Sequence, residues 1–155
     1  NVTNDGRLGW PQVLSMGSGP ADILVVDDDP VIRSSLQKLV SSLGYEVRVA
    51  ASAEEADTWL ASKRFDLVLL DIELPRMKGP EFLRWALERD PELAVIMLTG
   101  VDDPEVAISC LDAGARTYLV KPVEVEFLRL ALRDALAVRK LLIDRNRKAT
   151  ASPPS

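Results

Sequence analysis

The sequence predicts an α/β fold in which a doubly wound, five-stranded parallel sheet is covered by helices on both faces. Two observations lead to this prediction. Short apolar runs with little polar alternation recur along the chain, which is typical of strands buried on both faces. Each run precedes a longer stretch whose apolar residues recur every three to four positions, as in a helix packed on a sheet. Right-handed crossovers between such units favour the strand order 2-1-3-4-5.

The first two strand–helix units show the clearest local signals. Residues 23–26 form the first apolar run, and Pro30 begins the helix after it, because proline suits the first turn of a helix. The second strand is expected at residues 45–49, where apolar and polar residues alternate. Ser52 and Glu55 then form a capping-box pattern, which predicts the start of the second helix.

The other three units follow the same pattern. Strands are predicted where apolar residues are continuous, and helices where proline or a capping pattern opens a periodic stretch. The remaining elements are expected at residues 65–70 (strand), from 80 (helix), 94–98 (strand), 104–113 (helix), 117–120 (strand) and about 123–148 (helix).

Three regions are expected along the chain. Residues 1–20 mix Gly, Pro, Ser and Asn without periodicity, which indicates a flexible leader. Residues 21–138 form the folded domain, and residues 139–155 a helical extension followed by a linker or tail. Apolar residues in the last helix follow a 3-4-3-4 spacing. The first of these residues are expected to pack against the core. The later ones suggest that the helix dimerises or leads to an output domain. The residues with this spacing are Leu128, Ala131, Ala135, Val138 and Leu142.

The composition excludes several kinds of function. The chain contains no histidine, which removes serine–histidine and cysteine–histidine catalysis and histidine-ligated metals. Its single cysteine, Cys110, permits neither an internal disulfide nor a cysteine-based zinc site. A net charge of −5 argues against direct nucleic acid binding, which needs clustered positive charge. No apolar run approaches the roughly 18 residues that span a membrane, and no secretory signal is visible. We therefore expect a cytoplasmic domain without membrane contact.

The residues that follow the predicted strands point to a metal site. In doubly wound sheets, ligands bind beyond the carboxyl ends of the strands. The polar residues expected there are Asp27, Asp28, Asp71, Thr99 and Lys121. Clustered carboxylates repel one another by about 4 kcal/mol at ~4 Å and an effective dielectric of ~20. A hard cation with oxygen ligands relieves that repulsion, and an open site that keeps water molecules favours Mg²⁺.

The residue types at this site suggest phosphoryl transfer. Asp71 is the candidate nucleophile, because a carboxylate is ionised at neutral pH and can form an acyl phosphate. Asp28 is expected to bind Mg²⁺ directly, and Asp27 to hold the ion through water or to orient a ligand. Lys121 supplies a fixed positive charge and Thr99 a hydroxyl donor for the transferring oxygens.

The motifs around these residues resemble those of response-regulator receiver domains, which belong to two-component signal transduction and have a flavodoxin-like fold. The resemblance covers residues 22 to about 138. The last helix is expected to extend beyond the part that a receiver core requires. Each motif is weak alone, but their order and spacing together are specific. The motifs are Val25-Val26-Asp27-Asp28-Asp29, Leu69-Leu70-Asp71-Ile72-Glu73-Leu74-Pro75 with Gly79, Leu98-Thr99-Gly100, Gly114-Ala115, Tyr118 and Lys121-Pro122.

The resemblance implies a role for each site residue. It implies that Asp71 accepts a phosphoryl group from a sensor histidine kinase or a histidine phosphotransfer protein. The implied Mg²⁺ ligands are Asp27, Asp28, Asp71 and the backbone carbonyl of Glu73. The resemblance further implies that the domain is not an enzyme with a separate substrate, that it promotes only its own phosphorylation and dephosphorylation, and that it controls an output domain or partner protein.

The resemblance also implies phosphoryl contacts from Thr99 and Lys121 and a cis peptide bond before Pro122. We hypothesise a switch in which phosphorylation draws the Thr99 hydroxyl inward and leaves space for the Tyr118 ring. The face formed by the fourth helix, the fifth strand and the fifth helix would then change.

A few positions depart from the commonest receiver pattern. Gly100 stands where alanine is more usual, Lys78 where aspartate is frequent, and Thr117 where aspartate or asparagine often precedes the aromatic residue. We hypothesise that Gly100 and Glu73 alter water access and charge at the mouth of the site, and hence the lifetime of the phosphoaspartate.

Two alternatives to a phosphorylated receiver remain open from the sequence. Asp71 and Glu73 superficially resemble the two acids of aspartate-based phosphatases, although those enzymes place aspartate at the second position. The second alternative is a receiver-like interaction module that never binds phosphate. Turnover of small phosphate esters would indicate the first, and failure to bind beryllofluoride with Mg²⁺ would indicate the second.

Overall fold

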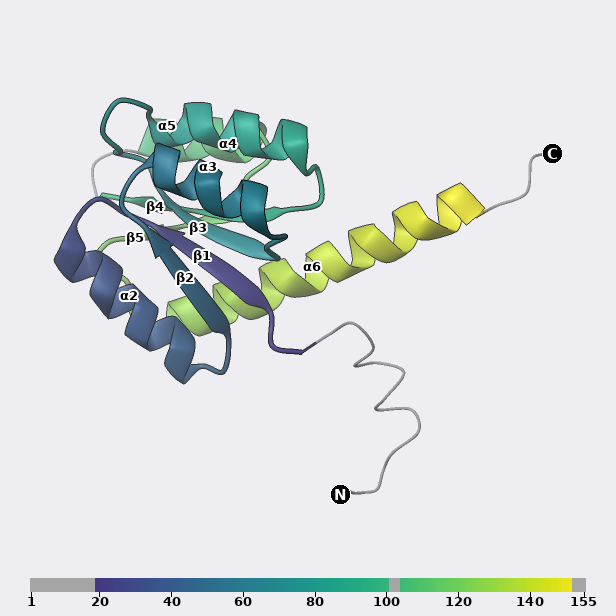
Figure 1. Ribbon diagram of the computed structural model, residues 1–155, viewed down its shortest axis with the longest axis horizontal. Coiled ribbons are helices and arrows are strands. Elements are labelled where there is room, and N and C mark those ends of the chain that lie inside the picture. The colour runs from purple at the N-terminus through teal and green to yellow at the C-terminus, as the bar shows by residue number, and fades with distance from the viewer. Residues whose placement is uncertain (1–18, 101–103, 152–155) are drawn as a thin grey trace, which may run out of the picture.

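The computed structural model describes residues 19–100 and 104–151. Five parallel strands form one sheet in the order β2-β1-β3-β4-β5 (Figure 1). The predicted fold class and strand order are therefore confirmed. The leader expected at residues 1–20 lies almost entirely outside the described residues.

The strands are short, and their ends are in register. Val26 of β1 pairs with Leu70 of β3, and Asp71 pairs with Leu98 of β4. The residues that follow each strand are thus brought to one edge of the sheet. The strands are β1 (Asp22–Val26), β2 (Glu46–Ala50), β3 (Leu67–Asp71), β4 (Ala94–Thr99) and β5 (Thr117–Val120).

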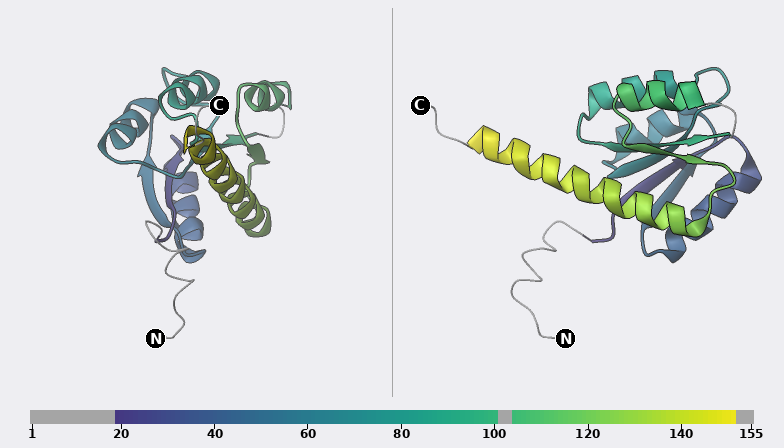
Figure 2. Two further views of the ribbon diagram at one scale, coloured as in Figure 1. Left: turned by 90° about the vertical axis from the view of Figure 1, so that its right-hand side faces the viewer. Right: turned by 180° about the vertical axis from the view of Figure 1, so that it is seen from behind.

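Helices cover both faces of the sheet (Figures 1 and 2). One layer contains α2 and α6, and the other contains α3, α4 and α5. The C-terminal half of α6 projects past the sheet. The helices are α2 (Pro30–Ser42), α3 (Ala53–Ser62), α4 (Gly79–Arg89), α5 (Pro104–Asp112) and α6 (Val125–Ala151). Among the described residues, no helix combines the length and the apolar content needed to cross a membrane.

Each face of the sheet has its own apolar core, because successive strand residues point to opposite faces. Leu24 and Val26 pack under α3 and α4, whereas Ile23 and Val25 pack under α2 and α6. Every residue of β3 is buried, as its continuous apolar sequence predicts. The two cores hold the central strands rigidly beneath the site.

The two helix starts with the clearest sequence signals, at Pro30 and Ser52, are both present. The Asp29 side chain caps α2 by accepting hydrogen bonds from the backbone N–H groups of Val31 and Ile32. Ser52 caps α3 by accepting from the N–H of Glu55. The Glu55 carboxylate returns to the N–H of Ala51, one residue before the cap, rather than to Ser52 itself.

Several expected element boundaries are shifted by the structure. The second strand begins at Glu46 rather than at residue 45, and the third at Leu67 rather than at residue 65. Asp71 is the last residue of β3, as expected for a strand that ends there. Strand ends depend on pairing with neighbours, which propensity alone does not reveal.

The face of α6 that docks on the domain also differs from the predicted stripe. Leu128, Leu132 and Ala135 are buried, and Arg139 continues this line below the sheet. Val138, which the 3-4-3-4 stripe included, is exposed. One α6 helix runs through the boundary expected at residue 138, and the division of the chain into domain and extension stays a prediction.

Candidate functional site

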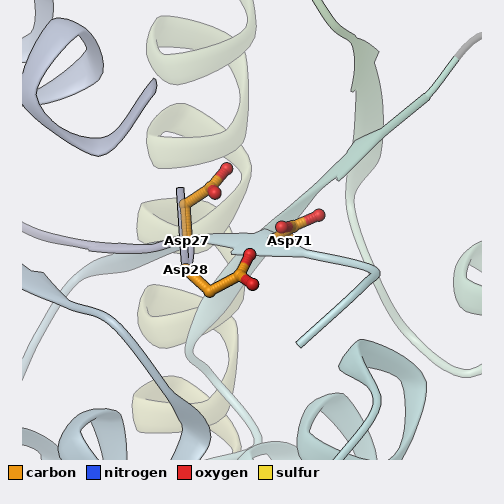
Figure 3. A group of neighbouring side chains, drawn as sticks. All are labelled: Asp27, Asp28 and Asp71. Atoms are coloured by element: carbon orange, nitrogen blue, oxygen red, sulfur yellow. The ribbon is translucent and has the colours of Figure 1, made fainter. Parts of the chain in front are cut away.

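Three carboxylates meet at the carboxyl edge of the sheet (Figure 3). Asp27 and Asp28 follow β1, and Asp71 ends the adjacent strand β3. One oxygen from each side chain lies within 4.8 Å of the others. Asp27 and Asp71 are buried, whereas Asp28 is exposed. The cluster therefore has a buried base and one side open to solvent.

Lys121 reaches this cluster from β5, two strands away from β3. Its Nζ lies 2.8 Å from Asp27 Oδ2 and 3.1 Å from Asp71 Oδ1. Its backbone N–H donates to the carbonyl of Thr99 over 2.8 Å, which ties the residue after β5 to the end of β4. The Lys121-Pro122 peptide bond is cis, as the resemblance implied. One ammonium group thus bridges two buried carboxylates.

The charges at the site influence one another. Burial, with the negative charge of Asp27 beside it, raises the pKa of Asp71 from 3.8 to about 6. The hydrogen bond from the Glu73 N–H and the positive charge of Lys121 oppose this rise. Burial alone would lower the pKa of Lys121, but its contacts with Asp27 and Asp71 outweigh burial, and its pKa is raised. At neutral pH the site thus holds an ionised Asp71 and a cationic Lys121.

The other expected site residues lie around the cluster in different ways. Thr99 is buried at the end of β4, where its hydroxyl donates to the carbonyl of Gly100 over 3.1 Å. The Glu73 N–H donates to Asp71 Oδ1, while the Glu73 carboxylate forms an ion pair with Lys78 at 2.9 Å. Tyr118 lies on β5 with 38% of its surface exposed. The cluster therefore includes Asp71 and Lys121, with Tyr118 standing outside it.

Sequence reasoning missed the structural role of Gly79 at the site. The Gly79 N–H donates to the carbonyl of Ile72 over 2.8 Å, which closes the loop after β3. A Cβ atom built on Gly79 would lie 2.7 Å from Ile72 Cα and closer still to the backbone oxygen of Asp71. Only glycine permits this approach of two backbone segments. The signal available in the sequence was a glycine directly before the proline of a helix start.

Arg33 was also missed. It is the fourth residue of α2, and its guanidinium Nη1 donates to the backbone oxygen of Asp27 over 2.8 Å. Side chains on a helix lean toward its N-terminus, which lets Arg33 reach back over the first turn. The signal available in the sequence was an arginine six positions after Asp27, in the first turn of a helix, from where its side chain can reach back toward the end of β1.

The donor set suits a hard divalent cation. All three candidate side chains offer carboxylate oxygens, which are the ligands that Mg²⁺ prefers. Among the residues that the structure describes, Lys121 is the one side-chain cation that pairs with Asp27 and Asp71. The exposed position of Asp28 leaves room for the water molecules that Mg²⁺ usually retains. The residues therefore fit the metal that the sequence suggested.

Comparison with known proteins agrees with this geometry. Residues 23–133 match the family model described as the response regulator receiver domain. The chain belongs to the response regulator receiver family. It is accordingly a signalling domain of two-component systems, in which phosphorylation occurs on an aspartate.

Receiver domains of known sequence and structure resemble this one closely. The response regulator MprA of Mycolicibacterium vanbaalenii is 40% identical over 117 residues, which are 76% of this chain and 51% of MprA. The transcriptional regulatory protein ZraR of Klebsiella oxytoca is 37% identical over 126 residues, or 81% of this chain and 28% of ZraR. The receiver domain of NtrX from Brucella abortus matches with a TM-score of 0.73 and 36% identity, over 75% of this chain and 98% of that one. This receiver domain thus spans about half the length of MprA and less than a third of the length of ZraR.

Proposed function

We propose that the receiver domain accepts a phosphoryl group on Asp71 in a Mg²⁺-dependent reaction. The donor would be the phosphohistidine of a sensor histidine kinase or a histidine phosphotransfer protein. A carboxylate oxygen of Asp71 forms the new bond to phosphorus as the bond from phosphorus to the donor nitrogen breaks. The domain would promote only this reaction and the later hydrolysis of its own acyl phosphate, and it would act in the cytoplasm.

Each side chain has a part in this proposal. Asp27, Asp28, Asp71 and the backbone carbonyl of Glu73 would hold Mg²⁺. When bound, the ion offsets negative charge on the transferring oxygens. Lys121 keeps a positive charge beside Asp71 throughout, and the Thr99 hydroxyl is available to donate to a phosphoryl oxygen.

The observation that carries the proposal is the bridge from Lys121 Nζ to Asp27 and Asp71, at 2.8 and 3.1 Å. Buried charges need partners, and this bridge brings residues from β1, β3 and β5 together at one point. The bridge places a cation in contact with the proposed nucleophile. If the aspartates served only as a helix cap, or Lys121 only as a solvated strand end, no such contact would be needed.

Mass spectrometry of the intact protein tests the proposal. Treatment with acetyl phosphate and Mg²⁺ should add one phosphoryl group, and chelation of the metal should prevent the addition. Asp71→Asn should remain unmodified, whereas Asp90→Asn, a control at the opposite edge of the sheet, should be modified normally. No modification of the wild type, or equal modification of Asp71→Asn, would refute the proposal.

The output of the domain is the second part of the proposal. Phosphorylation would change the face formed by α5, β5 and α6 and thereby act on an output domain or a partner protein. A second copy of the chain could bind through α6, where Val138 and Leu141 are exposed. Light scattering before and after phosphorylation tests this: dimerisation should be weakened by Leu141→Glu, and a monomer in both states would exclude it.

A further inference from the structure

The loop between β1 and α2 is fixed by bonds to its first residue, Asp27. The Asp27 N–H donates to the carbonyl of Ala50 over 3.1 Å, and Oδ1 accepts from the N–H of Asp29 over 2.9 Å. Lys121 holds Oδ2. The remaining polar group is the backbone carbonyl, which accepts from Arg33. Arg33 is therefore the one side chain of α2 seen to hold the backbone of this loop.

Asp28 depends on that backbone for its position. Its side chain is exposed, and within the part of the chain that the structure describes no hydrogen bond or ion pair is seen on its carboxylate. The peptide group is planar, so the Asp27 carbonyl oxygen and the Asp28 Cα move together. A bond that fixes the Asp27 carbonyl thus fixes where the Asp28 Cα lies, and hence the positions that the Asp28 carboxylate can reach relative to Asp71.

The position of Arg33 needs an explanation, because two effects oppose it. A cation near a helix N-terminus is unfavourable with respect to the helix dipole. A cation near a proposed Mg²⁺ site also repels the ion. The bond to Asp27 is the contact that accounts for the arginine, since the guanidinium presents donors in a fixed plane toward the carbonyl.

We infer that Arg33 is a positioning residue for the metal site: its guanidinium fixes the Asp27–Asp28 peptide and thereby prepares Asp28 to bind Mg²⁺. This inference rests on the proposed function, because it requires that the acidic cluster binds the ion. It extends the proposal from the groups that contact the metal to one that acts through them.

Calorimetric titration with MgCl₂ at constant ionic strength distinguishes positioning from simple charge. Arg33→Met removes both the hydrogen-bond donors and the positive charge of the side chain. Arg33→Lys keeps the charge but loses the planar arrangement of donors in the guanidinium. If positioning dominates, Arg33→Met should bind Mg²⁺ roughly ten-fold more weakly, as for other residues that orient metal ligands. Arg33→Lys should recover part of that loss. If charge repulsion dominates, Arg33→Met would bind equally or more tightly, and the inference would be overturned.

Lys38→Met is the matched control, because it removes a positive charge from the exposed side of the same helix. It should leave Mg²⁺ affinity unchanged or slightly increased. In the metal-free protein, the amide resonance of Asp28 should shift in Arg33→Met and not in Lys38→Met, which gives a readout independent of the metal. In Arg33→Met the phosphorylation rate should require a higher Mg²⁺ concentration than in the wild type, whereas Lys38→Met should show the wild-type Mg²⁺ dependence.

The outcomes separate this inference from the proposed function. Failure of the wild type to bind Mg²⁺ would refute the proposed site as a whole. Normal binding by the wild type together with unchanged binding by Arg33→Met would refute only the role of Arg33. A loss of Mg²⁺ affinity in Arg33→Met that Arg33→Lys shows in full, with no shift of the Asp28 amide resonance, would also count against positioning.

Discussion

Asp71 combines burial with a negative charge, and this conflict defines the chemistry of the site. The side chain is almost fully buried beside a second buried carboxylate, Asp27. A group selected only for stability would be uncharged here. The fold tolerates the charge because Lys121 and the Glu73 N–H contact it. Stability is therefore reduced at the position that the proposed reaction requires.

Asp71→Asn should stabilise the metal-free protein at neutral pH. The folded-state pKa of Asp71 is raised from 3.8 to about 6, so the native state binds more protons than the unfolded state between these values. Stability should therefore fall as pH rises through this window, by up to roughly 3 kcal/mol. The substitution removes this loss. Urea unfolding with chelator should show a gain at pH 7.5 that vanishes near pH 4; equal gains at both values would contradict the assigned cause.

Gly79→Ala should destabilise the domain through the backbone of the site. The added methyl group would collide with the Asp71 carbonyl and Ile72 Cα, and the loop would have to move. Overpacking of this kind costs about 1–3 kcal/mol. Gly100→Ala is the control, because a Cβ there meets nothing within 4 Å. The midpoint of thermal unfolding should be lower for Gly79→Ala than for Gly100→Ala. Equal midpoints would show that the loop after β3 can move to accommodate the methyl group without loss of stability.

At the scale of elements, the sequence predicted what depends on local pattern. Continuous apolar runs located the strands β1, β3 and β4, and Pro30 and Ser52 located two helix starts. The strand order followed from crossover handedness. Because the strands are parallel, this order also predicted which side chains would meet at the carboxyl edge. The acidic residues and Lys121 were thus placed correctly before any contact was known.

Contacts that join distant segments were not predicted, and α6 shows why. The spacing of apolar residues suggested a stripe through Val138, but Arg139 faces the domain instead. Its Nη1 lies 3.0 Å from Oδ1 of Asp66, the residue just before the start of β3. From the sequence alone, an arginine in the C-terminal half of a helix is interpreted as a solvated charge unless its partner is known. The same reason hid Arg33, whose partner is a backbone carbonyl.

Arg139→Met should loosen the C-terminal half of α6 and leave the sheet intact. The fully buried apolar residues of α6 end at Ala135, and the ion pair with Asp66 is the next contact along the helix before the hydrogen bond from Asn146 to Glu92. Amide hydrogen exchange at residues 139–148 should increase several-fold, while β1 and β3 remain protected. Arg133→Met, whose guanidinium pairs only with the neighbouring Asp134 among the described residues, should change little. Unchanged exchange in Arg139→Met would mean that the ion pair with Asp66 does not anchor this segment.

At the scale of the whole molecule, the site and the proposed output face share the strand β5. Lys121 at the carboxyl end of β5 contacts Asp71, and Tyr118 lies three residues earlier on the same strand. Thr99 ends β4 and bonds through its carbonyl to the backbone of Lys121. Only one or two residues therefore separate Asp71 from the proposed output face on β5 and α6. No long pathway is needed for the switch.

Binding of beryllofluoride with Mg²⁺ should turn the Tyr118 ring inward. In the structure the Thr99 hydroxyl donates to the Gly100 carbonyl, and 38% of the Tyr118 surface is exposed. A phosphoryl mimic on Asp71 offers the hydroxyl a charged acceptor, which forms a stronger hydrogen bond than a carbonyl does. Once the hydroxyl moves, the ring gains space to pack. Resonances of ring-labelled Tyr118 should shift and lose solvent contact in the wild type, and Thr99→Ala should uncouple this change from beryllofluoride binding. A Tyr118 ring that stays equally exposed when the mimic is bound would show that the output face is reached by another route.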